Sequence, residues 1–311
     1  MKRTSPLQRT EPVKKLVSAI LTSDWHLRED QPQCRTDAFW VSQFANMDIV
    51  KALQTKFNCP VIHAGDLFHH WKPSPVLLTE TMKHIPLQFH TVYGQHDLPQ
   101  HNLDLSFKCG VNTLEEAGVL TVLEGMHWGQ KLDEDDNIKN ALRFDRTNKY
   151  MLVWHHLVCK SRADLWPGNT ASEAKRLLER YPEFDIILTG DNHQPFVETV
   201  EAYGGRHLVN PGCFTQQKVS ERDYKPRVYL WCEDDNSIEP VYLPYNPDVI
   251  TREHIEHKEK RDERIDAFIS KLSTDWDSEV SFEQNLNKFY SENTVGDPIK
   301  QIIAKAMDEG V

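Results

Sequence analysis

The stretch Val61-Ile62-His63-Ala64-Gly65-Asp66-Leu67-Phe68 decides the fold that we expect for this chain. A short apolar run ends in Gly-Asp, which predicts a buried strand that delivers one carboxylate to its C-terminal end. Glycine lets the backbone turn sharply there, and a carboxylate has two oxygens that can bridge two cations. Gly-Asp alone is weak evidence, because most such pairs are ordinary turns.

Four other polar clusters follow β-like apolar runs and carry Asp, His or Gln. They are Ser23-Asp24-Trp25-His26, Gly94-Gln95-His96-Asp97, Trp154-His155-His156 and Gly190-Asp191-Asn192-His193. Aspartate and histidine two residues apart on a loop can both turn toward one cation. We therefore interpret Asp66 as the bridge of a two-metal site that the five loops form together.

Length and composition indicate a globular protein of one large α/β domain with an appendage, or of two domains. The chain has 311 residues, of which 39% are hydrophobic and 27% are charged. Its formal charge of −11 argues against a protein that grips nucleic acid by bulk electrostatics alone, although a local basic groove is compatible with it.

Cysteine usage and the N-terminus bear on the cellular compartment. The six cysteines stand far apart without a C-x-x-C motif, so we expect buried reduced thiols rather than a zinc knuckle or a disulfide framework. The apolar run Leu16–Leu21 follows a polar, basic segment and is too short for a signal sequence or a membrane span. These features predict a protein of the cytoplasm that makes no membrane contact.

The order of apolar runs predicts two facing β-sheets flanked by helices, an α/β fold. Residues 1–15 should be a flexible N-terminus, residues 16–248 the domain that carries the five motifs and residues 249–311 a helical C-terminal region, which could bind a partner or cap the site. Helical patterns cover 37–57, 75–85, 111–117 and 171–180, the last with a capping box from Thr170 and Glu173. Strands are expected at 16–22, 60–64, 88–93, 120–123, 141–144, 150–154, 186–189, 197–200, 207–209, 228–231 and 240–243.

The strand-end motifs resemble those of the calcineurin-like metallophosphoesterases. Within that superfamily, Thr22-Ser23-Asp24-Trp25-His26-Leu27 and Gly65-Asp66-Leu67-Phe68, followed by Pro73-Ser74, are most similar to the nuclease subunit of the DNA double-strand-break repair complex (SbcD-like), phage relatives included. The resemblance covers about residues 16–245. It implies the four-layer αββα fold of that superfamily.

The resemblance also implies a role for each motif residue. One metal ion would be held by Asp24, His26, Asp66 and His193, and the second by Asp66, Gln95, His155 and Asp191. His96 would be the general acid or a transition-state contact at the scissile phosphate, with Asp97 orienting it. Of the two adjacent histidines, the first after the strand is the ligand in the family, which favours His155 over His156.

Two positions depart from the family pattern, and both concern the second metal. Gln95 stands where the family usually has Asn, and Asp191 stands where it usually has His. Both retain an oxygen that can coordinate a cation, and the added carboxylate favours Mn²⁺, or Mg²⁺, over Zn²⁺. The competing interpretation is a weakened or mononuclear site.

Several further side chains are candidates for substrate contact. His101 and Arg162 lie in loops near the expected site and could touch the substrate. His69-His70-Trp71 follows Asp66 and could stack on bases, but a packed loop explains these residues equally well.

The resemblance implies a metal-dependent DNA nuclease, an exonuclease with endonuclease activity, that acts in repair or recombination. Such nucleases work with an SMC-like ATPase, which binds the C-terminal helices of the nuclease. Relatives also form homodimers. The expected location is the cytoplasm of a bacterium or of a phage-infected host cell. One alternative is a small-molecule or nucleotide phosphodiesterase on the same fold. Another is a non-catalytic scaffold that binds DNA ends or the ATPase.

Overall fold

The structure is a computed structural model that describes residues 16–132, 141–161, 171–201, 205–274 and 281–308. The chain divides into two compact units, Met1–Thr251 and Arg252–Val311. The first contains both large β-sheets, and the second contains three helices.

A six-stranded sheet carries three of the predicted motifs. Its strands are, in spatial order, β13 (Ser237–Tyr242), β12 (Arg227–Cys232), β1 (Ala19–Thr22), β2 (Val61–His63), β3 (Phe89–Thr91) and β4 (Thr121–Val122). β1 to β4 run parallel, whereas β12 pairs antiparallel with both β1 and β13. The carboxyl ends of β1, β2 and β3 therefore meet at one edge.

A five-stranded sheet carries the other two motifs. Its order is β10 (Phe196–Val200), β11 (Arg206–Asn210), β9 (Ile186–Thr189), β6 (Lys149–Trp154) and β5 (Ala141–Phe144). β6, β9 and β11 are parallel, so the loops after β6 and β9 also share an edge. A separate pair of short strands, β7 (Val158–Cys159) and β8 (Ser172–Glu173), was not predicted from the sequence.

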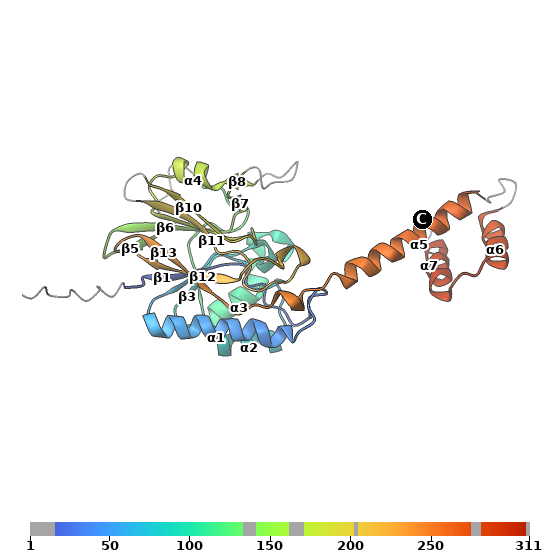
Figure 1. The fold of residues 1–311 in the computed structure, drawn as a ribbon. Coiled ribbons are helices and arrows are strands. Elements are labelled where there is room, and N and C mark those ends of the chain that lie inside the picture. The colour runs from blue at the N-terminus through green and yellow to red at the C-terminus, as the bar shows by residue number, and fades with distance from the viewer. Residues whose placement is uncertain (1–15, 133–140, 162–170, 202–204, 275–280, 309–311) are drawn as a thin grey trace, which may run out of the picture. The chain divides into compact units, whose positions relative to one another are not determined.

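The two large sheets pack face to face, and helices cover their outer faces (Figure 1). Leu21, Ile62, Val153, Leu188 and Trp231 belong to the buried core between the sheets. The helices α1 (Phe39–Phe57), α2 (Pro75–His84) and α3 (Gly110–Glu116) pack on the six-stranded sheet, and α4 (Ala174–Arg180) packs on the other. The expected arrangement of two sheets flanked by helices is confirmed.

Local sequence signals explain where the helices begin and end. The Ser74 hydroxyl accepts a hydrogen bond from the Leu77 amide at 3.1 Å, and Pro75 occupies the first turn of α2. Asn58 ends α1 in a left-handed conformation. The helix predicted from Ala171 begins three residues later, because Ser172 and Glu173 pair with β7, and its predicted cap Thr170 lies outside the described residues.

A series of 3₁₀ helices connects β3 to α3. These are η1 (Gln95–Asp97), η2 (Pro99–His101) and η3 (Leu103–Lys108). Two more, η7 (Val219–Glu221) and η8 (Pro247–Val249), lie before β12 and after β13. Short turns of this kind can change the chain direction within a few residues.

The second unit consists of α5 (Glu253–Thr274), α6 (Phe282–Glu292) and α7 (Asp297–Asp308), which confirms the helical C-terminal region. Ser281 caps α6 in a reciprocal pair with Gln284. Among the residues that the structure describes, no helix combines the length and the apolar character needed to cross a membrane.

All six cysteines are buried and unbonded to one another, as the sequence predicts. Burial raises the pKa of the Cys59 thiol to about 11 and that of Cys109 to about 12. The thiols of Cys59 and Cys109 are therefore protonated at neutral pH and poorly nucleophilic.

Candidate active site

Sheet register brings the five polar loops to one place. Thr22 of β1 lies opposite His63 of β2, which lies opposite Thr91 of β3, so the loops after these strands start level with one another. In the other sheet, Trp154 lies opposite Thr189. The Asp24 amide donates to the Gly65 carbonyl at 3.1 Å, and the His26 amide donates to the Asp66 carbonyl at 3.0 Å. The first two loops are therefore fixed to each other.

Four of the predicted ligands adopt left-handed backbone conformations, which non-glycine residues rarely do. The φ angles are 50° at Asp24, 45° at His26, 58° at Asp66 and 74° at Asp191. Residues in this region cost free energy and are concentrated at functional sites. The observed strain supports a functional role for these four turns.

Two glycines permit the close approach of the ligands. At Gly65 (φ 94°), a Cβ atom would lie 2.5 Å from Nδ1 of His155. At Gly94, a Cβ atom would lie 2.1 Å from Oδ1 of Asp66. Neither position can accept a side chain without displacing a predicted ligand.

Asp66 occupies the centre of the site. Its Oδ1 accepts a hydrogen bond from the His96 amide at 2.8 Å. Its Oδ2 lies 3.6 Å from Nε2 of His26 and 3.5 Å from Nε2 of His155, and has no hydrogen-bond partner among the described residues. One carboxylate oxygen thus stands between two imidazoles from different loops, which is the arrangement a bridging ligand requires.

The first candidate ligand group consists of Asp24, His26 and His193, whose ligand atoms lie within 4.8 Å of one another. Nε2 of His26 is 3.1 Å from Nε2 of His193. Nδ1 of His193 faces the carboxylate of Glu221 and therefore carries a proton, so the neutral form of the ring presents a lone pair on Nε2. Burial lowers the pKa of His193, but the hydrogen bond to Glu221 and the Asp24 carboxylate outweigh it and raise this pKa. Ring nitrogens and carboxylate oxygens that converge in this way fit a divalent cation.

The second candidate group consists of Asp24, Asp66 and His155, again with ligand atoms within 4.8 Å. His155 donates from Nδ1 to the Ala64 carbonyl at 2.6 Å, and its Nε2 forms a second hydrogen bond with Oε1 of Gln95 at 2.7 Å. Gln95 in turn donates from Nε2 to Oδ1 of Asp191 at 2.6 Å. The two residues that depart from the family pattern are thus paired with each other beside His155.

Burial controls the protonation of the central groups. Desolvation raises the pKa of Asp66 well above its usual value, and the neighbouring Asp97 and Asp24 carboxylates raise it further. Desolvation also raises the pKa of Asp24 and lowers that of His26 well below normal. Oδ2 of Asp24, Oδ2 of Asp66 and Nδ1 of His26 are buried without a hydrogen-bond partner within the described segments. Bound divalent cations would offset the cost at the two carboxylates, so the donor set fits the two ions that the sequence implies.

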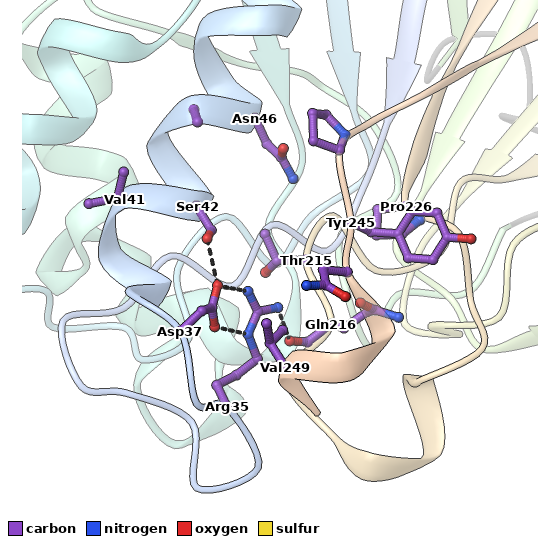
Figure 2. Close-up of a pocket in the computed structure, with 13 residues that line it drawn as sticks. Arg35, Asp37, Val41, Ser42, Asn46, Thr215, Gln216, Pro226, Tyr245 and Val249 are labelled. Carbon is purple, nitrogen blue, oxygen red and sulfur yellow. Dashed lines mark hydrogen bonds and ion pairs between the residues drawn. The ribbon is translucent and has the colours of Figure 1, made fainter. Parts of the chain in front are cut away.

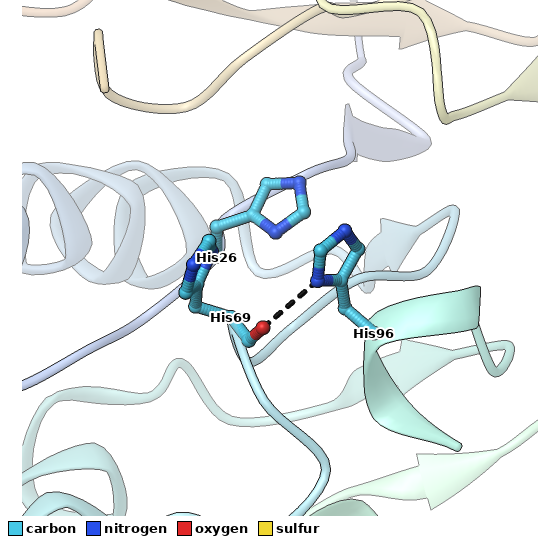
Figure 3. A group of neighbouring side chains, drawn as sticks. All are labelled: His26, His69 and His96. Atoms are coloured by element: carbon cyan, nitrogen blue, oxygen red, sulfur yellow. Dashed lines mark hydrogen bonds between the residues drawn. The ribbon is translucent and has the colours of Figure 1, made fainter. Parts of the chain in front are cut away.

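A third histidine cluster, His26, His69 and His96, lines the same site (Figure 3). His96 donates from Nδ1 to the main-chain carbonyl of His69 at 2.8 Å, and its ring centroid lies 4.7 Å from that of His26. The His69 ring stacks on His96 at 5.4 Å. Burial lowers the pKa of His69 to about 4 and also lowers the pKa of His96. His69 had no motif role in the sequence; the available signal was its place three residues after Asp66.

Asp97 contacts main-chain amides rather than the ring of His96. Its Oδ2 accepts hydrogen bonds from the amides of Asp66 at 2.9 Å, Gly94 at 3.1 Å and Leu67 at 3.3 Å. Its Oδ1 accepts one from Phe68 at 3.0 Å. The structure thus corrects the expected role: Asp97 fixes the Asp66 loop, and the His69 carbonyl is the partner of the His96 ring.

The remaining sequence candidates lie at the rim or elsewhere. His101 donates from Nδ1 to the Gln95 carbonyl at 3.0 Å and is exposed. His156 bonds to the Ser172 hydroxyl at 2.8 Å and stacks on Trp154, so its neighbour His155 is the one directed to the site. Arg162 lies outside the described residues.

The structure adds one acidic residue that the sequence did not indicate. Glu221 is 1% exposed at the end of η7, and its carboxylate contacts His193. It lies 28 residues beyond His193 in the chain and belongs to no recognised motif. Only the fold brings the two together.

A cavity of about 330 Å³ lies apart from these ligands, between α1, Thr215–Gln216 and residues 244–249 (Figure 2). Arg35 on its wall is paired with the Asp37 carboxylate and donates to the Gln216 carbonyl at 3.0 Å. The positive charge of Arg35 is therefore already neutralised within the cavity wall.

The comparison with protein families agrees with the fold. Residues 18–233 match the family model of the calcineurin-like phosphoesterase superfamily domain. The chain is 13% identical to a metallophosphoesterase from Sphaerobacter thermophilus, with a TM-score of 0.35, covering 74% of this chain and 90% of that one. It is 12% identical to a candidate 5′-nucleotidase from Staphylococcus aureus in complex with α-ketoglutarate, with a TM-score of 0.41, covering 79% of this chain and 58% of that one. The comparison with curated proteins gave no match.

Proposed function

We propose that this chain, which belongs to the calcineurin-like phosphoesterase superfamily, is a two-metal nuclease that hydrolyses DNA phosphodiester bonds. Membership makes it a metal-dependent hydrolase of a family that generally binds two divalent ions. The observation that carries the proposal is the position of Asp66 Oδ2, 3.6 Å from His26 and 3.5 Å from His155. A single oxygen placed in this way can serve two ions at once.

The proposed ligand sets are those that the sequence implies. Asp24, His26, Asp66 and His193 would hold one ion, and Asp66, Gln95, His155 and Asp191 the other. When bound, two such ions neutralise the phosphodiester and acidify the attacking water. The oxygen donors of Gln95 and Asp191 favour Mn²⁺ or Mg²⁺.

His96 is the proposed general acid. Its Nδ1–H is committed to the His69 carbonyl, so Nε2 carries a proton only in the imidazolium form. Burial lowers the pKa of His96, and the negative charge of a phosphodiester beside the ring would favour the imidazolium again. The attacking water would first lose a proton to solvent; as the hydroxide oxygen bonds to phosphorus and the P–O bond to the leaving group breaks, the leaving oxygen takes the Nε2 proton of His96. The product ring is then the neutral tautomer that the His69 carbonyl already stabilises.

Support for DNA as the substrate comes from the motifs around Asp24 and Asp66, which resemble those of the SbcD-like branch. The test compares end-labelled linear duplex, closed circular DNA and bis-p-nitrophenyl phosphate, each with Mn²⁺. We expect release of nucleotides from linear duplex and loss of this activity in His96→Ala. Hydrolysis of the small ester alone would assign the site to a small-molecule phosphodiesterase. Hydrolysis of neither would favour a non-catalytic scaffold.

The second unit is the proposed contact for a coiled-coil, SMC-like ATPase. The large apolar side chains of Phe282 and Ile302 are 48% and 58% exposed on α6 and α7. Exposed apolar groups on amphipathic helices favour docking to a partner helix. Light scattering of the full chain with the ATPase of the same genome should show a complex, weakened by Ile302→Asp. The same measurement without the ATPase tests the proposed homodimer.

A further inference from the structure

We propose that Glu221 is a positioning residue of the metal site: its carboxylate holds the His193 imidazole with Nδ1 protonated, so that the Nε2 lone pair faces the ion. The inference rests on the metal site proposed above and is independent of the choice of DNA as substrate. It follows from the hydrogen-bond donors around this one side chain.

The surroundings of Glu221 require a group that only accepts hydrogen bonds. Oε1 faces Nδ1 of His193. Oε2 accepts from the Gln217 amide at 2.6 Å and from the Lys218 amide at 3.0 Å. Main-chain amides can only donate, so Oε2 must be an acceptor. A carboxylate satisfies all three partners, and in doing so fixes the proton of His193 on Nδ1.

The segment that carries Glu221 is tied to both sides of the candidate site. Gln217 donates from Nε2 to the main-chain carbonyl of His26 at 3.1 Å. Gln216 donates from Nε2 to the carbonyls of Glu221, Arg222 and Tyr224 at 2.9, 2.6 and 3.0 Å. The carboxylate is therefore held in place before any ion binds, and it acts on His193 as a fixed acceptor.

An amide of the same shape cannot replace this carboxylate. If Glu221→Gln keeps its oxygen toward His193, the NH₂ group opposes the amides of Gln217 and Lys218. If the side chain rotates, the NH₂ group faces Nδ1 and favours the tautomer with the proton on Nε2, where the ion should bind. The loss of a hydrogen-bond partner that orients a metal-bound histidine typically weakens metal affinity by about 10- to 100-fold.

The first test is calorimetric titration of the full chain with Mn²⁺ alone. We expect Glu221→Gln to weaken one of two binding events by about 10- to 100-fold and to leave the other near wild type. Glu116→Gln, which makes the same charge change at an exposed site on α3, is the matched control and should change neither event. Unchanged binding in Glu221→Gln, or equal weakening of both events, would overturn the proposal.

The second test uses no variant of Glu221, so its result does not depend on whether such a variant folds. Long-range ¹H–¹⁵N correlation spectra of ¹⁵N-histidine-labelled, metal-free protein at pH 9 report the tautomer of each ring, and His193→Gln identifies the His193 signals. We expect the proton on Nδ1; a proton on Nε2 would overturn the proposal. Protein that passes both tests but cleaves no DNA would refute the nuclease assignment and leave the role of Glu221 intact.

Discussion

Replacing Asp97 by asparagine should loosen the Asp66 loop and the metal site with it. The Asp97 side chain is fully buried and accepts hydrogen bonds from four main-chain amides, three through Oδ2 and one through Oδ1. Asparagine keeps one acceptor oxygen. With that oxygen in the place of Oδ2, the NH₂ group of asparagine faces the Phe68 amide, so two donors meet. The three remaining hydrogen bonds then have a neutral acceptor in place of a charged one.

The cost of Asp97→Asn can be estimated from these four contacts. A buried donor left without an acceptor costs about 1–3 kcal/mol. Three hydrogen bonds that change from charged to neutral acceptors lose about 1 kcal/mol each. The sum, about 4–6 kcal/mol, is an upper bound, because asparagine also removes the cost of burying a charge, which raises the pKa of Asp97 to about 6. Typical domains are stabilised by roughly 5–15 kcal/mol.

Urea unfolding followed by tryptophan fluorescence measures this loss, and calorimetry with Mn²⁺ measures the effect on the site. Asp104→Asn, at an exposed position of η3, is the matched control and should stay within about 0.5 kcal/mol of wild type. If Asp97→Asn costs less than about 1 kcal/mol, well under the value of even one lost charged hydrogen bond, the four contacts do not hold the loop as described. Unchanged Mn²⁺ affinity would likewise refute the link between this loop and the ligands.

Three further outcomes are expected. His155→Ala should lower phosphodiesterase activity by at least about 100-fold, because it removes a proposed ligand. The control His156→Ala should stay near wild type. Equal effects would contradict the assignment of His155 as the metal ligand. Gly94→Ala should abolish Mn²⁺ binding, since its Cβ would meet Asp66 Oδ1 at 2.1 Å, whereas Gly296→Ala, whose Cβ would have 3.8 Å of space, should not. Ellman's reagent at pH 8 should react with the six buried cysteines only after denaturation, and rapid labelling of the native protein would contradict their burial.

The sequence by itself determined the sheets and the edge at which the site lies. Each motif follows a short apolar run, and parallel strands place their carboxyl ends together whatever lies between them in the chain. Asp24, Asp66, His155 and His193 could therefore be assigned to one site before the fold was known. The helices of the first unit could also be predicted from the sequence, because apolar spacing is a local signal and so is a cap such as Ser74 followed by Pro75.

Tertiary structure alone decided which groups orient the ligands. Glu221 contacts His193, the His69 carbonyl holds His96, and Asp97 binds main-chain amides instead of the ring beside it. Such contacts depend on the distance and direction between atoms on different loops, and main-chain carbonyls and amides are present at almost every residue. No local pattern can therefore distinguish the carbonyl or carboxylate that receives a particular proton. The fold makes that choice when it packs the loops against one another.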